Sequence, residues 1–152
     1  MKPETGTEPG ERGRAIMAQM DEQVRRMVLA EMRQAHELAA LAGRPEDEMR
    51  GDLARWKSEG CIVSVEHEGA EYFPPFALDP DAGYRPYPVM AEVIRILRQA
   101  RSWSGTWAFA SWLIGLNSFL DDQRPRDLLA LDPEWVIEAA RAAVETEQSP
   151  HG

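Results

Sequence analysis

The sequence predicts a mainly α-helical protein: helix-turn-helix-like helices with a small β-hairpin in the position of a wing, followed by a small C-terminal helical domain. Three observations predict this class. Apolar residues recur at spacings of three and four over most of the chain, as they do in amphipathic helices. One β-rich stretch, residues 61–73, interrupts that pattern. A segment with five prolines, residues 74–88, then separates two helical regions.

The same observations divide the chain into five segments. We expect a flexible tail over 1–13, because this stretch contains Gly and Pro and almost nothing to bury. The helix-turn-helix-like region with its hairpin spans 14–76, and a Pro-rich linker spans 77–88. The C-terminal helical domain covers 89–146, and a frayed tail over 147–152 follows it.

Capping signals place the individual elements. A first helix is expected from Arg14 to Ala42, with Gly43 as its C-cap. Pro45 fits the first turn of a second helix, Glu46–Ser58. The elements expected after it are strands over 61–65 and 70–73, a helix over 89–101, a short helix capped by Thr106 and ended at Gly115–Asn117, a brief turn of helix from Pro125, and a last helix opened by Asp132-Pro133.

Composition and charge exclude several classes of protein. The chain has 152 residues, of which 43% are hydrophobic and 28% charged, as in ordinary soluble proteins. Its net charge of −9 argues against a protein that coats nucleic acid or an anionic membrane, because that affinity comes from Lys and Arg. No apolar run approaches a membrane span, and the N-terminus lacks the apolar core of a signal peptide. We therefore expect a cytoplasmic protein without membrane contact.

No residues suggest catalysis or cofactor binding. Cys61 is the single cysteine, so the sequence has no disulfide framework and no Cys-based zinc site. The three histidines share no metal-ligand spacing, and no nucleotide-binding or metalloprotease motif is present. The adjacent carboxylates of Asp121 and Asp122 fit a solvated loop. We expect a non-enzymatic protein without cofactor or metal.

The helix pair and hairpin have the outline of a winged helix-turn-helix, with the second helix in the reading position. Four basic side chains there are the candidates for contact with DNA. Eight acidic residues share the stretch 44–76, and those at the start of the reading helix would repel phosphates. Three alternatives stay open: a helix pair that merely packs, a DNA-binding module and a protein-binding face. The DNA-binding candidates are Arg44, Arg50, Arg55 and Lys57.

Aromatic residues are concentrated in the C-terminal half. Trp107 and Trp112 are expected in the core, since aromatic residues at helical spacing usually pack inward. The stretch 107–114 is apolar nearly all round, so either flanking helices or a partner chain must cover it.

The C-terminal half resembles the toxin-binding domain of Xre/MbcA/ParS-type antitoxins. The resemblance covers about Tyr72 to Val144 and depends on the order and spacing of its motifs. Asp121-Asp122-Gln123 stands where that family has glycines, and Asp tolerates positive φ better than most residues. The residues that carry the resemblance are Trp112-Leu113, Asn117, Leu120, Pro125 and Leu128-Leu129, with Tyr72–Phe76, Pro88-Val89 and Val93–Leu97 upstream.

This resemblance implies a small helical antitoxin that binds a cognate protein toxin, often of the NAD-consuming RES type, and blocks its active site. Family members tend to form homodimers, and many repress their own operon, which makes operator DNA a second partner. The alternative is a DNA-binding transcriptional regulator with a winged helix-turn-helix. The candidate toxin-binding surface consists of Leu116, Asn117, Phe119, Leu120, Arg124, Pro125 and Arg126, supported from within by Trp112 and Leu128.

Overall fold

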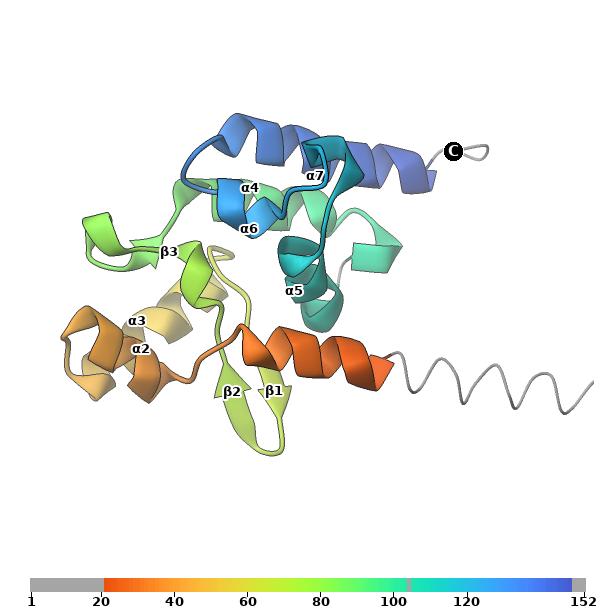
Figure 1. The fold of residues 1–152 in the computed structure, drawn as a ribbon. Helices are drawn as coiled ribbons and strands as arrows, with labels where there is room; N and C mark the ends of the chain where they lie inside the picture. The colour runs from red at the N-terminus through yellow and green to blue at the C-terminus, as the bar shows by residue number, and fades with distance from the viewer. Residues whose placement is uncertain (1–20, 104, 149–152) are drawn as a thin grey trace, which may run out of the picture.

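The structure is a computed structural model that describes residues 21–103 and 105–148. These residues form a mainly helical protein with a small antiparallel hairpin, which confirms the mainly α-helical part of the prediction (Figure 1). The expected tail over 1–13 and the start of the first expected helix lie outside the described residues. In Figure 1 the C-terminal helices lie above the helix over 21–30, and the hairpin projects below it.

The longer elements are a helix over 21–30, α2 (Ala35–Ala42), α3 (Glu46–Ser58), β1 (Val65–His67), β2 (Ala70–Tyr72), α4 (Pro88–Leu97), α5 (Thr106–Ile114), α6 (Pro125–Leu128) and α7 (Pro133–Gln148). The shorter ones are the 3-10 helices η1 (Pro75–Ala77), η2 (Pro80–Ala82), η3 (Arg101–Trp103) and η4 (Ser118–Leu120), and the strands β3 (Leu78–Asp79) and β4 (Arg85–Pro86).

The single helix expected up to Ala42 is wrong, because the chain leaves the helix at residues 31–34. Arg33 forms an antiparallel bridge with Phe73, in which each backbone N–H donates to the other's carbonyl, at 2.8 and 2.7 Å. Gln34 then caps α2 by a capping box with Glu37. Apolar periodicity continues through the break, so it could not reveal this long-range pairing.

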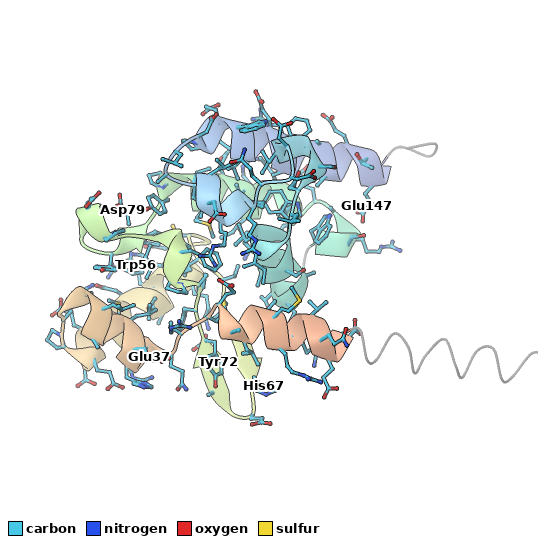
Figure 2. All side chains as sticks on the ribbon, in the orientation of Figure 1. Glu37, Trp56, His67, Tyr72, Asp79 and Glu147 are labelled. Carbon is cyan, nitrogen blue, oxygen red and sulfur yellow. The ribbon has the colours of Figure 1, made fainter. Side chains whose placement is uncertain are left out.

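The α2–α3 pair forms largely as predicted. Gly43 ends α2 with a φ of 66°, a left-handed conformation that glycine adopts without penalty. The bounds of α3 are those expected, although Pro45 is its N-cap rather than a residue of its first turn. Trp56, labelled in Figure 2, is buried between this pair and the segment that follows.

The first strand of the hairpin lies later than predicted. A two-residue turn at Glu68-Gly69, with φ of 51° and 80°, pairs Val65 with Tyr72 and leaves residues 61–64 outside the ladder. Ile62, one of those residues, is fully buried all the same. Only Val65 of the β-rich run 61–65 is paired, and the apolar residues before it are buried without a strand partner.

Residues 77–88, expected as a linker, are packed. Ala77 and Leu78 are both buried, the first in the core of the C-terminal helices and the second in the core of α2 and α3. β3 and β4 pair antiparallel, with Leu78 opposite Pro86. Pro80 begins η2, Pro86 lies in β4 and Pro88 begins α4.

Pro125 begins α6 as expected, whereas two other expectations for the C-terminal helices are wrong: the N-cap of α5 is Gly105 rather than Thr106, and α4 ends at Leu97 rather than at residue 101. α4 packs along α7, and α5 and α6 complete their core. The Asp132 side chain accepts the N–H of Trp135 at 3.2 Å, as an N-cap does. The frayed tail expected from residue 147 is wrong for its first two residues, because α7 continues to Gln148. The Glu147 carboxylate there accepts the backbone N–H groups of Arg101 and Ser102, at 2.5 and 2.8 Å.

A third cluster of buried residues joins the two halves. Val28 in the helix over 21–30 and Met32 just after it pack with Ala110 and Ile114 of α5. The other buried residues of α5 face the core shared with α4 and α7. The chain therefore covers most of the apolar surface of this helix itself.

Candidate protein-binding surface

A groove runs between the end of α5, η4 and the C-terminal part of α7. Its volume is about 550 Å³. Small side chains of α7, among them Ala139, Ala142 and Ala143, form one wall. Trp112 lies under the groove with 5% of its surface exposed. Leu116 and Phe119 form the opposite rim.

The rim presents apolar side chains to solvent. Leu116 is 71% exposed and Phe119 is 46% exposed. Such exposed large apolar residues beside a groove are typical of places where another macromolecule binds. The predicted contact residues Leu116, Phe119 and the half-buried Asn117 therefore do lie together at one groove.

Asn117 shapes this rim. Its side-chain oxygen accepts the N–H of Phe119 at 2.9 Å, and its backbone N–H donates to the carbonyl of Gln123 at 3.0 Å. Asp121 and Asp122 close the turn with φ of 56° and 63°. The antitoxin family that this half resembles has glycines at the corresponding positions, whereas here both aspartates adopt left-handed φ values. The turn needs no glycine to form.

Three of the predicted contact residues are not exposed: Leu120 and Pro125 are buried, and Arg126 is half-buried. Leu120 is fully buried in the C-terminal core, because η4 turns its side chain inward. Arg126 is half-buried and pairs with Glu31, and its guanidinium carbon lies 4.8 Å from the ring centre of Phe76. The surface prediction is wrong for Leu120, which is core, and for Arg126, which joins α6 to Glu31 just after the helix over 21–30.

The remaining candidates divide as follows. Arg124 is exposed and stays a possible contact. Pro125 and Leu128 are both buried in α6. Leu128 was predicted to lie inside, whereas Pro125 was predicted to lie at the surface.

The wall that α7 contributes to the groove was not predicted from the sequence. The closely spaced alanines over 139–143 are a signal that could have found it, because small residues leave room for a groove.

The four candidate DNA-binding residues are already engaged by acids. Asp52 accepts from two arginines, and hydrogen bonding by Arg44 holds its pKa below the ordinary value. Burial raises the pKa of Glu71, but hydrogen bonds from Lys57 and Ser64 outweigh it and lower the pKa. The ion pairs are Arg44 with Glu48 and Asp52, Arg50 with Glu46, Arg55 with Asp52, and Lys57 with Glu71.

These pairs weaken the electrostatic case for DNA. Each cation would have to leave a neighbouring carboxylate before it could neutralise a phosphate. The acids that open α3, Glu46 to Glu48, lie where a recognition helix presents its residues to bases. The structure thus gives the basic residues an intramolecular role.

Within residues 21–103 and 105–148, no group of three or more His, Cys, Asp or Glu side chains is arranged to hold a metal ion. No helix in the same part of the chain is both long enough and apolar enough to span a membrane.

Comparison with family models, with curated proteins and with solved structures gives no match for this chain.

Proposed function

We propose that this chain is an antitoxin-like protein that binds a partner toxin through the groove between α5 and α7. The observation that carries the proposal is the pair of exposed apolar side chains, Leu116 and Phe119, on the rim of that groove. The sequence resemblance of this half to antitoxin domains supports the same assignment. The role is non-enzymatic and cytoplasmic.

Neutralisation would work by occlusion. Burial of two large apolar side chains in a partner supplies binding energy without any proton transfer. The Asn117 side chain accepts the backbone N–H of Phe119, which fixes the backbone there, so little backbone freedom is lost on binding. The bound chain would then cover the toxin's substrate cleft.

The test uses a double variant of the rim. Leu116→Ser with Phe119→Ser should weaken binding to the partner toxin by tenfold or more, about 1.4 kcal/mol. The assay is co-purification and rescue of growth during co-expression, followed by a titration of the purified proteins. Met27→Ser with Leu41→Ser is the matched control, because those side chains are 60% and 56% exposed elsewhere.

The control should bind like the wild type. Equal binding by the rim variant and the control would refute the groove as the toxin-binding site. Circular dichroism checks that both double variants stay folded.

A DNA-binding regulator is the second candidate, and the element order favours it. The pair α2–α3 followed by the hairpin β1–β2 is the order of a winged helix-turn-helix. The ion pairs of Arg44, Arg50, Arg55 and Lys57 argue against it. A mobility-shift assay at low salt with the DNA upstream of this gene tests it; a shift at micromolar protein supports DNA binding, and none rejects it.

A further inference from the structure

A second groove lies at the other end of α7. The starts of α4 and α7 and the η2 turn enclose a volume of about 630 Å³. Tyr87, Val89, Leu129 and Ile137 make its floor apolar. Figure 2 labels Asp79, which borders this groove, and Glu147, near the first groove, on opposite sides of the molecule.

The rim of this groove is acidic. Asp79, Asp81, Glu92 and Glu134 line it, and among its described lining residues none is Lys, Arg or His. Glu92 is paired with Arg95 at 2.5 Å. The other three carboxylates have no ion pair within the described part of the chain, so the rim keeps a surplus of negative charge.

Helix dipoles reduce this surplus without cancelling it. The N-termini of α4 and α7 both meet the groove. Each contributes roughly half a positive charge, about one charge together. Three carboxylates without ion pairs outweigh that, and the groove stays negative.

The rim carboxylates also affect Tyr87 on the floor of the groove. The Tyr87 phenol is half-buried, and its pKa is raised first by burial and then by the carboxylates of Asp79 and Asp81. Leu131 follows Ala130 of the groove lining and is 81% exposed, which extends the apolar surface outward.

We propose that this acidic groove is a second docking surface, and that its occupant is a basic amphipathic segment of a partner protein. Arg and Lys match it because their aliphatic stems lie on apolar surface while their charged ends reach the carboxylates. A neighbouring large apolar side chain would fill the floor. The surface uses the opposite end of α7 from the toxin-binding groove, so the proposal stands without the proposed function.

The test titrates the full chain with a short peptide in which arginine and leucine alternate, and follows backbone amide shifts by NMR. Binding should shift the amides around Val89, Ala130 and Glu134. Asp81→Asn with Glu134→Gln should weaken binding about threefold to tenfold, since each exposed charge pair contributes modestly. Glu138→Gln with Glu145→Gln is the matched control, because both exposed carboxylates lie on α7 outside this groove and the change in net charge is the same.

The control variant should change binding less than twofold. Equal weakening by both double variants would show attraction to the overall negative charge and overturn the proposal. A peptide of alternating arginine and glycine that binds as tightly would also overturn it, because the apolar floor would then play no part. So would the absence of binding, amide shifts centred elsewhere, or a concentration-dependent dimer that buries this groove.

Discussion

The guanidinium of Arg126 in α6 pairs with the carboxylate of Glu31, 95 residues earlier in the chain. Phe76 lies against the same guanidinium at 4.8 Å. The pair thus connects the residue that follows the helix over 21–30 to α6. Both side chains are largely shielded, with 25% and 34% of their surfaces exposed.

Loss of this ion pair should destabilise the fold. Arg126→Gln is expected to lower the free energy of unfolding by about 1–2 kcal/mol, because a charge-assisted hydrogen bond and a cation–π contact are lost together. Urea denaturation measures the effect. Arg124→Gln, at an exposed neighbour, should cost less than about 0.5 kcal/mol. Equal costs for the two variants would contradict a structural role for Arg126.

Leu120 should behave as core and Leu116 as surface. Leu120→Ala is expected to cost about 2–4 kcal/mol of unfolding free energy, because it leaves a cavity in the C-terminal core. Leu116→Ala should stay within about 0.5 kcal/mol. Chemical denaturation of both variants checks this contrast. A stability loss at Leu116 as large as that at Leu120 would show that the rim is also buried.

The ion pair of Asp52 should make stability depend on acid pH. Its pKa is lowered in the folded chain, mainly by hydrogen bonding from Arg44, so its contribution is present above the ordinary value of 3.8. That contribution is lost as pH falls through the lowered pKa. The destabilisation caused by Asp52→Asn should therefore be largest near neutral pH and shrink in acid. Urea unfolding across this range tests the trend, with the exposed Asp47→Asn as control; a pH-independent effect of Asp52→Asn would contradict it.

The turn at Asp122 should reject β-branched residues. Its φ of 63° suits glycine and, to a lesser degree, aspartate. Asp122→Val is expected to destabilise the fold by about 1 kcal/mol or more, whereas Asp122→Gly should stay within about 0.5 kcal/mol. Thermal unfolding compares the two. Similar melting temperatures for both variants would rule out a left-handed conformation at this position.

Local signals predicted the helices more accurately than the strands. Gly43, Pro125 and Asp132 marked helix ends or starts that the structure contains, because caps depend on neighbouring residues. The strand at 61–65 was misplaced because its β-rich composition reflects burial of Ile62 and Val63 in two different cores. Composition alone does not distinguish a buried segment from a paired strand.

The candidate site was predicted in part. Leu116 and Phe119 lie exposed on a groove rim, whereas their contact with a partner stays a prediction. The boundary of the predicted surface was wrong at Leu120 and Arg126, because exposure depends on the direction of each side chain after η4 and α6 have packed. The α7 wall was missed, since residues 139–146 are distant from the rim in sequence.

Spacing and capping within a few residues were enough to predict the helical class, several helix starts and ends and the apolar character of α5. The break at residues 31–34, the acidic partners of the cations and the exposure of each apolar side chain follow from how the chain folds in three dimensions. Those outcomes depend on partners far along the chain. Arg33 leaves the helical conformation where its backbone pairs with Phe73, and Arg126 forms an ion pair with Glu31. No local pattern encodes such a pairing, because its free energy arises when distant segments meet.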